Sequence, residues 1–174
     1  MRKIFLPGTI LLSLIALVRA ADPAKTDANK ATSATFLITG LHCPPCTSTV
    51  ERSLSKTPGI RLVKVDWNTK NAKVEFDEST IPAQRVAELI AATPHMMGPS
   101  MHYDSWLALK AADVKDDATA KAAKEALGKV AGVKKAEAFP DQHIVEVQFA
   151  SDGNVTSAQL IEALSSANIK SENY

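Results

Sequence analysis

The spacing of apolar side chains predicts alternating strands and helices along the first half of the chain. Val50 and Leu54 stand at helical spacing, whereas Ala72, Val74 and Phe76 alternate with polar neighbours as in a half-buried strand. A second helical pattern follows and begins at Pro82. Proline suits the first position of a helix, because the N–H that it lacks would have no partner within the helix there. The predicted elements are strand 35–39, helix 45–56, strand 60–66, strand 72–76, a helix that starts at 82, and a strand near 101–103.

The second half of the chain repeats the first. Its predicted elements are strand 106–110, helix 118–130, strands near 133–139 and 143–149, and helix 157–166. Matched positions lie 73 residues apart and include Leu54 with Leu127, Gly59 with Gly132, Val74 with Val147, and Phe76 with Phe149. Similarity at one fixed offset indicates two copies of one structural unit.

Each copy has the element order strand, helix, strand, strand, helix, strand. Two helices on one face of a four-stranded antiparallel sheet make the ferredoxin-like arrangement. The predicted fold class is therefore α+β, with two ferredoxin-like βαββαβ domains over residues 34–103 and 104–174. Domains of roughly this size can fold alone.

Residues 1–20 have the features of a cleavable signal peptide. Arg2 and Lys3 precede an apolar run that reaches Val18, and Ala20 is a small residue at the expected cleavage site. The run is shorter than the roughly 20 apolar residues of a membrane-spanning helix. We expect a periplasmic or secreted protein without a stable membrane anchor, and an uncleaved N-terminal anchor is the alternative.

The mature chain is expected to be nearly neutral. Residues 21–33 are polar and predict a flexible tether, because they have too little apolar surface to bury. Loss of Arg2, Lys3 and Arg19 with the signal peptide leaves 17 basic and 19 acidic residues. This balance, without a clustered basic face, argues against a nucleic-acid partner, because phosphate neutralisation supplies most of that affinity.

Two cysteines lie between the first predicted strand and the first predicted helix, in the segment Gly-Leu-His-Cys-Pro-Pro-Cys. Cys43 and Cys46 are three positions apart, and the second is near the first turn of the helix. The partial positive charge of a helix N-terminus favours thiolates. Two thiolates can hold one soft ion, and Cu(I), Hg(II) and Zn(II) all accept sulfur. Zinc in a closed structural site is coordinated by four ligands, so two cysteines favour an ion that takes fewer ligands. We therefore expect Cu(I) first.

Residues 34–93 resemble the heavy-metal-associated (HMA) domain, the family of copper chaperones, of the N-terminal modules of copper-transporting ATPases and of the periplasmic mercury-binding protein. The family pattern Gly-Met-x-Cys-x-x-Cys, with Val-Glu after it, corresponds here to Gly40, Leu41, Cys43, Cys46, Val50 and Glu51. Core and turn positions also match at Leu54, Gly59, Val63, Val65 and Asp66. Leu41 replaces the family's methionine and is expected to fill the same buried space. The Pro44-Pro45 pair is stiffer than usual.

The resemblance implies that Cys43 and Cys46 ligate the metal ion directly. It also implies that the protein is a carrier or chaperone and not an enzyme. Such a carrier would exchange its ion with a metal-transporting ATPase or a metalloenzyme. In the second copy, Asp116 and Thr119 stand opposite the two cysteines. We therefore expect a degenerate HMA-like domain there that folds without binding Cu(I).

Three other interpretations remain open, two of the cysteine pair and one of the whole protein. In an oxidising compartment the two thiols could form a structural disulfide. Cys-Pro-Pro-Cys at a strand-to-helix junction also occurs in thiol-disulfide oxidoreductases, although His42 stands where those enzymes usually have tryptophan. The third alternative is an adaptor whose second domain recognises a partner protein.

A second cluster of soft donors follows the second helix of the first copy. It contains His95, Met96, Met97, Met101 and His102, whose imidazole and thioether groups are ligands that copper accepts. These side chains, together with His42 beside the motif, could assist the cysteines. The alternative is that the methionines fill gaps in the core and that the histidines are solvated.

Overall fold

The computed structural model describes residues 31–174, so the predicted signal peptide and residues 21–30 of the predicted tether lie outside the described residues. The elements of the first half are β1 (Thr32–Thr39), α1 (Pro44–Leu54), β2 (Ile60–Asp66), β3 (Asn71–Phe76) and α2 (Ala83–Ala91). Those that follow are β4 (Asp104–Ala111), α3 (Asp117–Gly128), β5 (Val133–Phe139), a 3-10 turn (Pro140–Gln142), β6 (Ile144–Phe149), α4 (Ser157–Ser166) and β7 (Ser171–Asn173). The predicted alternation of strands and helices is confirmed.

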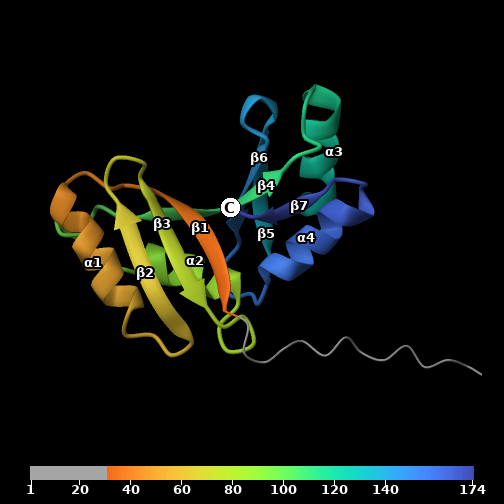
Figure 1. Ribbon diagram of the computed structural model, residues 1–174. Helices are drawn as coiled ribbons and strands as arrows, with labels where there is room; N and C mark the ends of the chain where they lie inside the picture. The colour runs from red at the N-terminus through yellow and green to blue at the C-terminus, as the bar shows by residue number, and fades with distance from the viewer. Residues whose placement is uncertain (1–30) are drawn as a thin grey trace, which may run out of the picture.

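All strands join one seven-stranded sheet in the order β2-β3-β1-β4-β6-β5, with β7 also paired to β4. Every pairing is antiparallel. In Figure 1, α1 and α2 lie beside the half that contains β1, β2 and β3, and α3 and α4 lie beside the half that contains β5 and β7. The two ferredoxin-like βαββαβ units are therefore present, but they belong to one continuous sheet.

The two units share β4. One edge of β4 pairs with β1 over residues 104–108 and then with β7 over residues 109–111, while the other edge pairs with β6 over residues 107–110. β4 is thus the last strand of the first unit and the first strand of the second. The separate strand predicted near residues 101–103 is wrong, because these residues form no strand and β4 fills its place.

The core lies on one face of this sheet. Phe36 is paired with Leu107, and Leu107 with Val147, so the three side chains project from the same face of β1, β4 and β6. All three are fully buried and belong to one hydrophobic cluster that also contains residues of all four helices. Apolar burial therefore runs without a break from the first unit into the second.

The sequence repeat corresponds to a structural repeat. Gly59 and Gly132 have the same left-handed backbone conformation, with φ of +89° and +99°. A register shift follows each glycine, in β2 between Ile60 and Leu62 and in β5 between Val133 and Lys135. Both copies therefore have the same helix-to-strand turn and the same bulge.

The start of β1 differs from the prediction. The tether was predicted to reach residue 33, but Thr32 and Ser33 pair with Phe76 and Glu75 of β3. The strand extends because β3 offers backbone partners to its end, although these two side chains are polar.

Within residues 31–174, none of the helices is long and apolar enough to span a bilayer.

Helix α2 also connects the units through polar contacts. The side chain of Gln84 is fully buried, donates to the carbonyl of Ala150 (2.7 Å) and accepts from the N–H of Val155 (3.1 Å). Nearby, the Glu78 carboxylate accepts from the N–H of Ser157, at the start of α4, over 2.6 Å. Side chains of the first unit thus satisfy backbone groups of the second, which fixes how the units pack.

Candidate metal centre

Cys43 and Cys46 are held at the N-terminus of α1. Cys43 is the N-cap residue with extended backbone angles, Pro44 and Pro45 occupy the first helical positions, and Cys46 follows in the same turn. Proline suits these positions because the first N–H groups of a helix have no partner within it. The local sequence therefore places the cysteines at a strand-to-helix junction, as predicted.

The two cysteines are joined by a disulfide, with their Cα atoms 5.4 Å apart. Cys46 is fully buried, whereas Cys43 is partly exposed. A disulfide has no thiolate to offer, so the pair can bind a metal only after a two-electron reduction to two thiolates. The redox state of this bond therefore controls what the site can do.

The backbone before the cysteines is tightly packed. Gly40 has φ of +85°, and a Cβ atom there would collide with the carbonyl oxygen of His102. Leu41 is buried, as expected for the position where the family has methionine. The loop that carries the cysteines therefore lies directly against the segment that precedes β4.

A positive charge lies beside the loop. The ammonium of Lys70 donates to the carbonyl of Leu41 over 3.4 Å and sits 2.7 Å from the ring centroid of Trp67. Desolvation lowers the pKa of Lys70 from its ordinary value. The ammonium contacts the backbone of Leu41, two residues before Cys43, and the N-terminus of α1 is the positive end of a helix dipole that favours thiolates once the disulfide is reduced.

His95 ties the cysteine loop to the segment after α2. Its ring is 9% exposed, with Nε2 2.9 Å from the Gly40 carbonyl oxygen and Nδ1 3.1 Å from the Met97 backbone nitrogen. An N–H donates to Nδ1, so Nε2 carries the proton and donates to Gly40, as neutral imidazole does. Both ring nitrogens are engaged, which makes His95 a structural tie. The ring also packs 4.7 Å from that of buried Tyr103.

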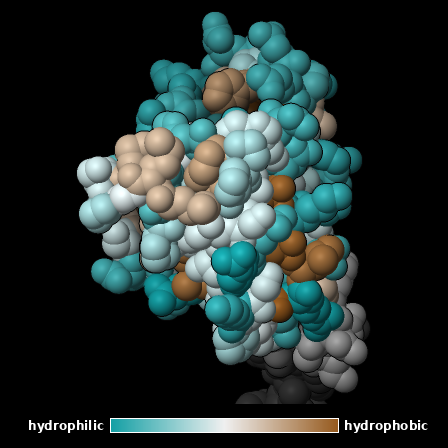
Figure 2. All heavy atoms as spheres, turned by 90° about the vertical axis from the view of Figure 1, so that its left-hand side faces the viewer, coloured by the Kyte–Doolittle hydropathy of each residue, from teal (hydrophilic) through white to brown (hydrophobic). Residues whose placement is uncertain are grey.

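The other candidate donors are largely exposed. Met96 and Met97 are 58% and 60% exposed, so the interpretation that they fill gaps in the core is wrong. The large exposed hydrophobic side chains of the described residues are Leu62, Met96, Met97, Phe139 and Tyr174. His42 and His102 are exposed as well, and Met101 is half-buried. Figure 2 turns the side of α1 toward the viewer and shows hydrophobic atoms in patches among hydrophilic ones.

The corresponding helix start in the second unit has a different chemistry. Asp116 is the N-cap residue of α3, and its carboxylate accepts from the N–H of Thr119 over 2.8 Å. The Thr119 hydroxyl accepts in return from the N–H of Asp116 over 3.1 Å. Hydrogen bonds from Thr119 lower the pKa of Asp116. A capping box thus occupies the positions that the cysteines hold in the first unit.

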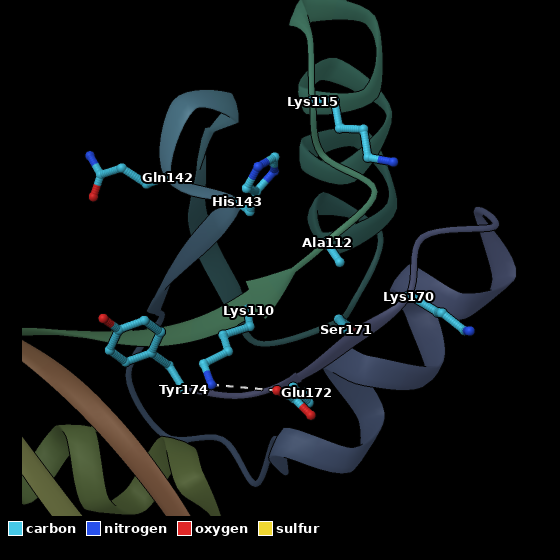
Figure 3. Close-up of a pocket in the computed structure, with 9 residues that line it drawn as sticks. All are labelled: Lys110, Ala112, Lys115, Gln142, His143, Lys170, Ser171, Glu172 and Tyr174. Atoms are coloured by element: carbon cyan, nitrogen blue, oxygen red, sulfur yellow. Dashed lines mark hydrogen bonds and ion pairs between the residues drawn. The ribbon is translucent and has the colours of Figure 1, made fainter.

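A cavity of about 750 Å³ lies in the second unit, away from the cysteines. Its lining includes Lys110, Lys115, Lys170, His143 and Tyr174, and Figure 3 shows the ion pair between Lys110 and Glu172 (3.5 Å) within it. The Nδ1–H of His143 donates to the carbonyl of Val114 over 2.9 Å. The lining contains no sulfur donor, so the soft-donor site and this cavity are separate features.

The match to a known family lies in the first unit. Residues 35–95 match the heavy-metal-associated domain family. The chain is 30% identical over 78 residues to the mercuric transport protein periplasmic component of Pseudomonas fluorescens, which covers 45% of this chain and 82% of that protein. It is 36% identical over 66 residues to the probable copper-transporting ATPase SynA of a Synechococcus strain, but this match covers 38% of this chain and only 8% of the ATPase.

Among solved structures, the water-soluble region of the P-type ATPase CopA from Bacillus subtilis aligns with 83% of this chain and 91% of its own length. The sequence identity is 18% and the TM-score is 0.41.

Proposed function

This chain belongs to the heavy-metal-associated domain family, and we propose that it carries one soft metal ion, Cu(I) first, between the sulfur atoms of Cys43 and Cys46. The observation that carries the proposal is the place of the two cysteines, at the N-cap and in the first turn of α1. Their sulfur atoms are close enough to bond to each other, so they can also clamp one ion after reduction.

The donor set favours Cu(I) over Zn(II). Within residues 31–174, no group of three or more His, Cys, Asp or Glu side chains is arranged to hold a metal ion. Zinc in a closed site takes four such ligands, whereas Cu(I) is selected by soft sulfur ligands. Hg(II) also accepts sulfur, and the mercuric transport protein named above makes it the second ion to test.

We infer a carrier outside the cytoplasm that exchanges its ion with another protein. Residues 1–20 resemble a signal peptide, and a similar protein is the periplasmic component of mercuric transport. A probable copper-transporting ATPase is similar to this chain over 66 residues, which makes a metal-transporting ATPase or a metalloenzyme the partner class that we propose. The partly exposed Cys43 would be the first sulfur that such a partner reaches.

Anaerobic titration tests the metal site. The fully reduced chain is expected to bind one Cu(I) per molecule, measured by native mass spectrometry with a competing chelator. Replacing Cys43 and Cys46 with serine should remove tight binding, because metal affinity depends on deprotonated ligands. A matched control replaces the half-buried Thr47 and Thr49 of the same helix with serine, which should keep one tight ion. Stoichiometric Cu(I) on the cysteine-free variant would refute the proposal.

A thiol-disulfide oxidoreductase is the second candidate, and the disulfide between a partly exposed and a buried cysteine favours it. Such an enzyme reduces a protein disulfide through a mixed-disulfide intermediate and is regenerated by a dithiol. The decisive assay is insulin reduction with dithiothreitol at catalytic concentrations of the chain. A carrier leaves the uncatalysed rate unchanged, whereas an oxidoreductase accelerates it in proportion to its concentration.

A further inference from the structure

Soft donor groups are concentrated at one end of the first unit. The chain has two cysteines, four methionines and four histidines. Apart from Met1, which lies outside the described residues, all the methionines are in the segment that joins α2 to β4: Met96, Met97 and Met101. Three of the four histidines, His42, His95 and His102, belong to this segment or to the cysteine loop. Packing does not require such a concentration of sulfur and imidazole in two short loops.

The fold brings these two loops together. Nε2 of His95 donates to the carbonyl of Gly40, and the carbonyl oxygen of His102 occupies the space that a Cβ atom would need at the same glycine. The rings of His42 and His95 are 5.7 Å apart between centroids. The side chain that precedes Cys43 and the turn that starts at His95 are therefore neighbours.

The turn presents thioethers to solvent. The backbone N–H groups of Met97 and Gly98 both bond back to His95, at 3.1 Å to Nδ1 and 3.3 Å to the carbonyl oxygen. These bonds fix a short turn in which Met96 and Met97 are more than half exposed. An exposed methionine contributes little to the core, whereas its thioether sulfur is a ligand selected by Cu(I).

We propose that the thioethers of Met96 and Met97 and the imidazole of His42 form a second Cu(I) donor set that works without the cysteines. Both nitrogens of His95 are used in hydrogen bonds, so His95 positions the turn and His42 supplies the nitrogen ligand. Thioethers and imidazoles do not form disulfides, so this set stays available while Cys43 and Cys46 are oxidised. It would hold the ion until a dithiol reduces the disulfide, becomes oxidised to a disulfide itself, and so restores the thiolates of Cys43 and Cys46. This proposal rests on the proposed function only because it assumes the same ion, Cu(I).

Silver(I) is the probe, because it has the ligand preferences of Cu(I) and does not reduce the disulfide. The oxidised chain is titrated with silver nitrate in chloride-free buffer by calorimetry and native mass spectrometry. We expect one Ag(I) per chain, with affinity at least tenfold lower in the Met96→Leu, Met97→Leu double variant. Leucine keeps the apolar volume and removes the sulfur. His42→Ala should also lower the affinity, and the control His143→Ala, an exposed histidine of the second unit, should leave it unchanged.

The reduced chain separates this inference from the proposed function. It should bind Ag(I) tightly through Cys43 and Cys46 whether or not the methionines are present. No Ag(I) on the oxidised chain, or equal affinity in the double variant, would overturn the second donor set and leave the cysteine site intact. Loss of tight binding by the reduced chain would instead overturn the proposed function.

Discussion

At the residue scale, Gly40 is the position where the cysteine loop and the segment before β4 come closest. Its φ of +85° lies in the left-handed region, and the carbonyl of His102 occupies the space that a side chain would need. Its own carbonyl accepts the hydrogen bond from His95. One residue thus sets both the path of the loop and the place of the turn that carries the methionines.

Replacing Gly40 with alanine is expected to lower the free energy of unfolding by about 1–3 kcal/mol, the usual range for a strained backbone residue. The matched control is Gly128→Ala, where a Cβ atom meets nothing within 4 Å at the end of α3. That change should not lower the free energy of unfolding and should raise it by less than the roughly 0.5–1 kcal/mol that alanine gains over glycine in the middle of a helix, because Gly128 is the last residue of α3. Urea denaturation measures both. Equal effects of the two substitutions would contradict the close contact at Gly40.

The role of each site residue was predictable only where it depends on local sequence. Prolines after Cys43 and the helical spacing of Val50 and Leu54 fix the place of the cysteines, and the structure has them there. The bond from His95 to Gly40 joins residues 55 positions apart, and no local pattern signals it. The sequence could not decide between an exposed and a buried Met96 for the same reason, because methionine is apolar by composition and its burial depends on tertiary neighbours.

At the scale of elements, α1 and α3 begin in the same way with different chemistry. Cys43 and Asp116 are both N-cap residues, and the repeat places Cys46 and Thr119 in the same later position of the first turn. The first turn of α1 contains the disulfide between Cys43 and Cys46, and the first turn of α3 contains a capping box. The four residues are Cys-Pro-Pro-Cys in α1 and Asp-Asp-Ala-Thr in α3, and the first and last of them carry the difference in chemistry.

The Asp116→Cys, Thr119→Cys double variant should gain a second soft-metal site. The cysteines would occupy the two positions that bring the sulfur atoms of α1 together. Under anaerobic reducing conditions we expect the stoichiometry of Cu(I), read by native mass spectrometry, to rise from one ion to two. The control is Asp116→Ser, Thr119→Ser, which should stay at one. A double-cysteine variant that still bound one ion would show that the second unit lacks the geometry of the first.

Strands and helices with a strong local rhythm were predicted to within about two residues of their ends, and strands defined by pairing were not. The bounds of β5 and α4 equal the predicted ones, since their alternating or helical apolar positions identify them locally. The strand expected near residues 101–103 was misplaced, because nothing in the local sequence shows that β4 has a partner on each edge. Sharing of a strand is a property of the whole sheet.

At the scale of the whole molecule, the shared strand makes the two units unequal. The second unit contains β4, α3, β5, β6, α4 and β7, so its sheet is complete within residues 104–174. The first unit, cut at the predicted boundary after residue 103, keeps β3 on one edge of β1 but lacks β4, which pairs with the other edge. Its inward side chain Phe36 would then lose its neighbour Leu107, and the outer edge of β1 would be unpaired.

Fragments test this asymmetry. We expect residues 104–174 to fold and unfold cooperatively on their own, with no metal present. Residues 31–103 should be poorly folded, because β1 would expose an unpaired edge and a buried aromatic ring, whereas residues 31–112, which include β4, should recover a cooperative transition. Circular dichroism during urea denaturation distinguishes the three.

Contacts of Gln84 with Ala150 and Val155 are absent from both first-unit fragments, so they cannot explain a difference between them. If residues 31–103 unfolded as cooperatively as residues 31–112, β4 would belong to the second unit alone.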